Sequence, residues 1–285
     1  MLCTIGYFFD YMVCNLTTQK YVLLPTLTDL SESYISPVVG SYLVFDPKKS
    51  PYYKVVVVSS SYDFDTSNFF VYSSESGSWN STVVTPRMHQ WVVGRGAVWN
   101  GVVILMSCWT DNGMESCAKH DHSYYRFDID AEKLTTTRVP APDTNLSKWN
   151  LYFGECKGHL LLIQMPQYNS TKFRVLEMMD GENSFRWTVK YVVDVTPLIF
   201  PRIRNCKFVV VSVVNVGAKE NHLAVVFYIR GKVMLYNIKC KTLKVLCDLP
   251  RSELAIWMVQ TLSILLCSCS SCLFIESLTP VLTPV

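Results

Sequence analysis

The sequence predicts an all-β protein of the β-propeller type, in which kelch-type blades are built from antiparallel hairpins that follow one another as a meander. A strand–turn–strand phrase recurs at residues 13–25, 125–140 and 234–250. Runs of β-branched residues such as YKVVVVSS suit the pleated surface of a sheet. Phrases repeated at such intervals indicate a repeat architecture. A Greek-key β-sandwich is the alternative, because short strands at even spacing serve either fold.

The three copies of the phrase share one construction. In each copy an apolar strand stops at Asn15, Asp128 or Asn237, a polar turn follows, and a second strand closes on Pro. Asn and Asp are frequent in turns because their side chains bond to nearby backbone amides. The copies therefore predict three hairpins of the same type.

Further hairpins are predicted between the copies. Asn100-Gly101 gives the strongest signal, because both residues tolerate a positive φ. Trp79 and Trp187 stand near the start of returning strands, and we expect them to pack between blades. The predicted turn residues are, in chain order, Asp46-Pro47, 74–77, Asn100-Gly101, Gly158, Asp180-Gly181, Arg230-Gly231 and 238–242.

Composition limits the classes of partner and compartment. The 285 residues include 26 basic and 23 acidic side chains, and a net charge of +3 gives no strong field for nucleic acid, so no nucleic-acid partner is expected. The eleven cysteines are scattered, and the N-terminus lacks the pattern of a signal peptide. We therefore expect a reducing compartment, the cytoplasm or the nucleus.

The chain divides into a domain over residues 1–250 and a divergent apolar tail over residues 251–285. The run Leu254 to Ile275 carries no charge and is long enough to cross a bilayer. Its serines and cysteines favour the last strands of the propeller instead, so a membrane is not the expected partner. The sequence leaves the choice between strand and membrane segment open.

No pattern of catalytic or metal-binding residues is found. The most metal-like group is Cys108, Cys117, His120 and His122, but its spacing fits no standard zinc site. Nucleophile elbows, phosphate-binding loops and dinucleotide fingerprints are absent from the sequence. We expect no enzyme activity, no cofactor and no metal.

Three residues in one long segment are candidates for contact with a partner. Trp109 lies beside the loop that contains His120 and His122, and Trp is favoured at interface hot spots. The sequence therefore predicts a partner-binding role for these three residues.

Six segments follow one another along the chain: VCNLTTQKYVLLP, SYLVFDPKKSPYYKVV, GAVWNGVV, YYRFDIDAEKL, YFGECKGHLLLI and FIESL. In this order they resemble motifs of the plant F-box associated domain. The first segment departs from the family at Leu16, where Pro is usual. Together they extend over most of the chain, which is identified on this basis as a relative of that family.

The resemblance implies a non-catalytic module that holds the protein substrate of a cullin-type ubiquitin ligase. An F-box ahead of the module would hold the ligase adaptor, but twelve residues precede Val13 here, too few for F-box helices. We therefore expect adaptor binding only in a longer form. The alternatives are a free-standing interaction or decoy module and a secreted carbohydrate-active propeller.

Overall fold

The computed structural model describes residues 2–5, 10–15, 17–27, 38–60, 66–84, 96–106, 122–139, 149–165, 171–181, 184–196, 209–217, 222–229 and 231–248. These residues form nineteen strands in five antiparallel sheets. Sheet 1 contains β1 (Leu2–Ile5), β2 (Asp10–Asn15) and β3 (Lys20–Leu23); sheet 2 contains β4 (Val38–Val44), β5 (Lys54–Ser60), β6 (Ser67–Ser73) and β7 (Ser78–Val84). Sheet 3 contains β8 (Gly96–Trp99), β9 (Val102–Met106), β10 (His122–Asp128) and β11 (Lys133–Val139). Sheet 4 contains β12 (Trp149–Cys156), β13 (His159–Met165), β14 (Lys172–Gly181) and β15 (Ser184–Asp194); sheet 5 contains β16 (Val209–Asn215), β17 (Leu223–Ile229), β18 (Lys232–Asn237) and β19 (Thr242–Asp248).

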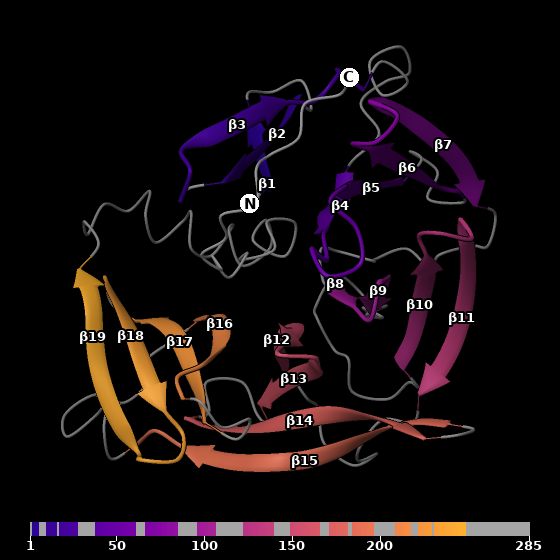
Figure 1. Cartoon of the computed structure of the whole chain (residues 1–285). Helices are drawn as coiled ribbons and strands as arrows, with labels where there is room; N and C mark the ends of the chain where they lie inside the picture. The colour runs from indigo at the N-terminus through magenta and orange to yellow at the C-terminus, as the bar shows by residue number, and fades with distance from the viewer. Residues whose placement is uncertain are drawn as a thin grey trace.

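The five sheets follow one another around a ring (Figure 1). Strands pair in chain order within every sheet, so each sheet is a meander. In sheets 2 to 5 the first strand faces the middle of the ring and the fourth lies on its rim (Figure 1). The predicted β-propeller class is confirmed, and the β-sandwich alternative is wrong, because the sheets do not form two stacked layers.

The hydrophobic core lies between neighbouring sheets. Four clusters of buried side chains each draw on two consecutive sheets, so sheets 2, 3 and 4 are buried on both faces. In β5, Val55 and Val57 pack in the cluster shared with sheet 1, whereas Val56 and Val58 pack in the cluster shared with sheet 3. Burying a Val side chain contributes about 1.5–3 kcal/mol. The uninterrupted valine run therefore joins three sheets.

Glycine in an inner strand allows sheets 2 and 3 to approach closely. Tyr42 of β4 lies over Gly96 of β8, where an added Cβ would stand 2.2 Å from the tyrosine oxygen and 2.7 Å from Leu105 Cδ2. No larger side chain fits there without displacing the ring of Tyr42. The two inner strands are thus held in contact by a large residue facing the smallest one.

Tryptophan N–H groups join the sheets through hydrogen bonds. Trp79 Nε1 donates to the Pro25 carbonyl at 2.8 Å and links sheet 2 to the segment after β3. Trp187 Nε1 of sheet 4 donates to the Tyr124 hydroxyl of sheet 3 at 2.8 Å, in a buried position. The predicted packing between sheets is confirmed for both residues, since Trp79 also packs half-buried against the cluster between sheets 1 and 2.

Most predicted turns are confirmed, and one is displaced. Asp180 and Gly181 belong to β14, where they pair with Phe185 and Ser184, so the chain reverses after them. The prediction of a turn at Asp180-Gly181 was therefore wrong in position. Cross-strand pairing continues through both residues, and the register of this long hairpin outweighs the local turn propensity of Asp-Gly.

The tail over residues 251–285, with the run Leu254 to Ile275, lies outside the described residues. Within the described ranges, no helix has the length and apolar character needed to span a membrane.

The bond between Trp187 and Tyr124 should couple the stabilities of sheets 3 and 4. We expect Trp187→Phe to lower the free energy of unfolding by about 1–3 kcal/mol, because a buried hydrogen bond is lost. In a double-mutant cycle with Tyr124→Phe, urea unfolding should give a coupling energy of about 0.5–3 kcal/mol. The matched cycle of Trp79→Phe with Tyr124→Phe should be additive. Additivity in both cycles would show that the bond does not join the sheets.

Candidate protein-binding surface

The three copies of the repeated phrase form the same capped turn. In each, the side-chain oxygen of Asn15, Asp128 or Asn237 accepts hydrogen bonds from the backbone N–H groups two and three residues later. The distances are 3.0 and 3.4 Å at Asn15, 3.0 and 3.0 Å at Asp128, and 3.0 and 3.0 Å at Asn237. The recurrence seen in the sequence is thus a recurrence of one hydrogen-bonded turn.

Each capped turn closes with a residue in the left-handed region, four positions after the cap. The φ angles are 55° at Gln19, 48° at Glu132 and 53° at Lys241. Sheet 2 uses a related turn, in which the Ser73 hydroxyl accepts from the Glu75 N–H at 3.3 Å and Gly77 has a φ of 68°. Backbone shape is therefore conserved in sheets 1, 2, 3 and 5 although the side chains differ.

These turns gather at one end of the ring. Because strands alternate in direction within a meander, the first and third connections of a four-stranded sheet lie at the same end. We call the exposed residues of these connections, with their equivalents in sheet 1, the turn face. It contains Thr17, Gln19, Lys48, Lys49, Glu75, Ser76, Asn100, Asp130, Glu132, Lys157, Lys239 and Lys241.

Charges divide the turn face into regions. The outer turns of sheets 2 and 3 carry Glu75, Asp130 and Glu132, whereas the outer turn of sheet 5 carries Lys239 and Lys241. The turn of sheet 1 carries neutral side chains at 17–19. One backbone design thus presents neutral, acidic and basic groups at different points of the ring.

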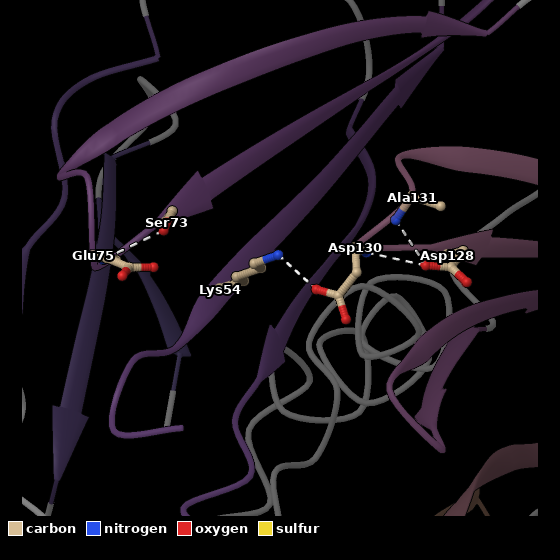
Figure 2. A network of polar contacts seen from close by, with 6 residues as sticks. All are labelled: Lys54, Ser73, Glu75, Asp128, Asp130 and Ala131. Atoms are coloured by element: carbon tan, nitrogen blue, oxygen red, sulfur yellow. Dashed lines mark hydrogen bonds and ion pairs between the residues drawn. The ribbon is translucent and has the colours of Figure 1, made fainter. Parts of the chain in front are cut away.

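Polar contacts hold the acidic region to the neighbouring sheet. Figure 2 shows Lys54 of β5 reaching towards Asp130 in the turn after β10, with 2.7 Å between Nζ and Oδ1. The Thr82 hydroxyl of β7 also donates to the Glu132 carboxylate at 3.2 Å. Exposed pairs of this kind contribute about 0–1 kcal/mol, so they orient the turn more than they stabilise the fold.

Asp128 keeps its charge as the cap of the same turn. The backbone N–H of Ala131 lowers the pKa of the Asp128 carboxyl below its ordinary value, and the N–H of Asp130 adds to this effect. Both nitrogens face the carboxylate in Figure 2. A carboxylate that accepts backbone amides in this way serves the turn and is a poor proton donor.

Further contacts on the turn face join sheets 3, 4 and 5. Trp99 Nε1 donates to the Gly158 carbonyl at 2.6 Å, which ties β8 to the turn between β12 and β13. Lys157 Nζ lies 3.5 Å from the Gly217 carbonyl of sheet 5. The turn face is therefore continuous from sheet 2 to sheet 5.

The charged groups of sheet 4 pair with one another. Glu177 of β14 contacts the His159 ring of β13 and forms an ion pair with Lys190 of β15, with 2.7 Å between the carboxylate and Nζ. Both carboxylate oxygens are therefore engaged. Within the described part of the chain, no group of three or more His, Cys, Asp or Glu side chains is placed to hold a metal ion.

The predicted partner-binding residues fall largely outside the described structure. Trp109 and His120 lie beyond it, and so do Cys108 and Cys117. The loop predicted around His122 ends earlier than expected, because His122 is the first residue of β10 and pairs with Val139. A binding role for Trp109, His120 and His122 stays a prediction. The sequence did not predict the turn face. Its signal is an Asn or Asp followed four residues later by a left-handed residue, and only the Asn or Asp is visible in the sequence.

The sequence profile of the F-box associated beta propeller domain matches residues 2–247. The chain belongs to this family. An F-box protein of Arabidopsis thaliana, At5g07610, is 28% identical over 267 residues, and the match covers 84% of this chain and 58% of the length of that protein. The family assignment favours a protein-interaction module over an enzyme.

Solved structures show a more distant likeness. A chain of the mitotic checkpoint complex aligns with a TM-score of 0.45 and 11% identity, over 86% of this chain and 72% of its own length. A post-proline cleaving enzyme from Rickettsia typhi aligns with a TM-score of 0.39 and 11% identity, over 85% of this chain and 33% of its own length. The fold of this F-box associated domain follows from its own strand pairing.

Acid should weaken the capped turn at Asp128. Its pKa is lower in the folded state than the ordinary value of 3.8, so the stabilisation is present above that value and is lost as the pH falls through the folded pKa. We expect Asp128→Asn to keep the cap and to lose less stability than the native protein between pH near 7 and pH near 3. The difference should be less than about 1 kcal/mol, because the carboxyl is partly exposed and solvent screens its charge. Urea unfolding at both pH values measures this. Equal losses in the two proteins would contradict it.

Proposed function

We propose that the F-box associated domain, residues 1–250, is a non-catalytic recognition module that binds another protein through its turn face. The observation that carries this proposal is that the turns in sheets 1, 2, 3 and 5 share a backbone design while their exposed side chains differ. Binding residues are commonly found on loops that a rigid scaffold holds in place.

Pre-organisation supports the proposal. Each capped turn is fixed by hydrogen bonds from its backbone N–H groups to the side chain of the cap. Sheets 2 to 4, which carry several of these turns, are packed on both faces. A surface that is already ordered loses less conformational entropy when a partner binds. The turn face is therefore suited to holding a protein without rearrangement of its backbone.

Family membership suggests what happens to the bound protein. We propose that the module presents its partner to a cullin-type ubiquitin ligase in the cytoplasm or the nucleus. Attachment to the ligase adaptor would be the task of an F-box in a longer form of the protein, because no described residue of this domain forms such helices.

Charge reversal on the turn face should weaken capture of the partner. We expect Lys48→Glu with Lys239→Glu to reduce recovery of bound proteins from plant extract by at least about tenfold, because interface charges select partners by complementarity. The matched control, Arg186→Glu with Lys244→Glu, makes the same charge change on the outer strands β15 and β19. Quantitative mass spectrometry of proteins recovered with the native chain and both variants gives the comparison.

Both variants should keep the melting temperature of the native protein, since the four altered side chains are exposed. Loss of partners in the outer-strand control, with full recovery by the turn-face variant, would place the interface on the rim and reject the proposal.

Binding of the cullin adaptor should depend on an F-box. We expect the chain of residues 1–285 to leave the purified adaptor unbound, and a fusion with F-box helices at its N-terminus to retain it in a pull-down. The reason is that the adaptor is proposed to contact the F-box and not the propeller. Retention of the adaptor by the unfused chain would contradict this division of roles.

A further inference from the structure

Basic side chains gather on the turn face where sheets 4 and 5 meet. Lys157 belongs to the turn between β12 and β13, and its ammonium reaches the Gly217 carbonyl just after β16. His222 precedes β17, and its Nε2 lies 2.9 Å from the ammonium of Lys239. Lys241 is two residues further along the same turn. We call Lys157, His222, Lys239 and Lys241 the basic cluster.

The backbone around the basic cluster is fixed. The His222 ring lies against Gly217, where an added Cβ would stand 2.2 Å from Nδ1. The Val216 N–H donates to the His222 carbonyl at 2.8 Å and closes this connection. The Asn237 cap holds the backbone of Lys239. The cationic groups therefore project from ordered turns of two different sheets.

The lysines of the basic cluster contact uncharged acceptors. Lys157 approaches a backbone carbonyl, and Lys239, which can only donate, approaches a ring nitrogen. Four other described lysines lie against carboxylates: Lys54 with Asp130, Lys172 with Asp194, Lys190 with Glu177 and Lys232 with Asp248. Among the described residues, no carboxylate pairs with Lys157 or Lys239, so their positive charge is available to an anionic partner.

The surroundings favour a peptide over a nucleic acid. Val216, next to Gly217, is 42% exposed and offers an apolar contact beside the charges. Asp130 and Glu132 occupy the turn face in sheet 3, where they would repel an extended polyanion. A short acidic segment with one apolar side chain satisfies both conditions.

We propose that the basic cluster binds an acidic segment of the partner protein, with an apolar side chain of that segment against Val216. This inference rests on the proposed function and names the chemistry of the partner. Exposed charges chiefly steer association and select the partner, so binding should weaken as salt screens them.

The test uses two fluorescent peptides, one of alternating glutamate and phenylalanine and one in which glutamine replaces glutamate. We expect the native chain to bind the acidic peptide more tightly at low salt than at high salt. Lys157→Glu with Lys239→Glu should weaken binding by about tenfold or more. The matched control, Arg186→Glu with Lys244→Glu, makes the same charge change on the outer strands β15 and β19 and should bind as the native chain does.

A footprint on the native cysteines locates the bound peptide. Cys240 is exposed between Lys239 and Lys241, and Cys247 is exposed near the far end of β19. The acidic peptide should slow alkylation of Cys240 by maleimide and leave that of Cys247 unchanged, as measured by mass spectrometry of the digested protein.

Three results would overturn the inference: no binding of the acidic peptide, equal losses in the cluster and control variants, or binding of a short DNA strand as tight as that of the peptide. The failures of the two proposals are distinguishable. If the partner recovered from extract is lost with Lys48→Glu and Lys239→Glu together but kept with Lys157→Glu and Lys239→Glu, the turn face remains the interface and the acidic segment is rejected.

Discussion

Burial of a sheet between two neighbours is the constraint on which the other features of this structure depend. In β13, Leu160 and Leu162 pack towards sheet 3, whereas Leu161 and Ile163 pack towards sheet 5. Because successive side chains of a strand point to opposite faces, a stretch of strand that is enclosed between two sheets is apolar at consecutive positions. The rim strand β19, which lacks this enclosure, is exposed at most positions. The continuous apolar runs of the sequence are the direct result.

The same constraint frees the ends of the sheets for recognition. Stability comes from the clusters between the sheets, so the turns need only reverse the chain. A cap such as Asn237 and a left-handed residue such as Lys241 are sufficient for that task. The exposed side chains between the cap and the left-handed residue do not pack in the core, so they can differ from sheet to sheet. Because the core provides the stability and the turns provide the exposed side chains, one scaffold can present different chemical groups at each point of the ring.

The charges on the turn face are distributed unevenly around the ring. Acidic side chains lie on the outer turns of sheets 2 and 3, Lys48 and Lys49 lie on the inner turn of sheet 2, and the basic cluster lies where sheets 4 and 5 meet. A partner with charges of one sign would be attracted to one region and repelled from the other, which restricts the orientations in which it can bind. The net charge of +3 does not reveal the separate acidic and basic regions, because it is a sum over both.

Local patterns in the sequence determined the strands, the caps at Asn15, Asp128 and Asn237, and most of the turns. These features depend on residues that are close along the chain, such as a run of valines or an Asn-Gly pair. Asp180-Gly181 was misplaced because strand pairing, a non-local interaction, extends the ladder past it. Only the tertiary structure decided which turns share a face, and that Lys157 of sheet 4 reaches Gly217 of sheet 5. Such contacts depend on how whole sheets dock around the ring, and no pattern within a single hairpin encodes that docking.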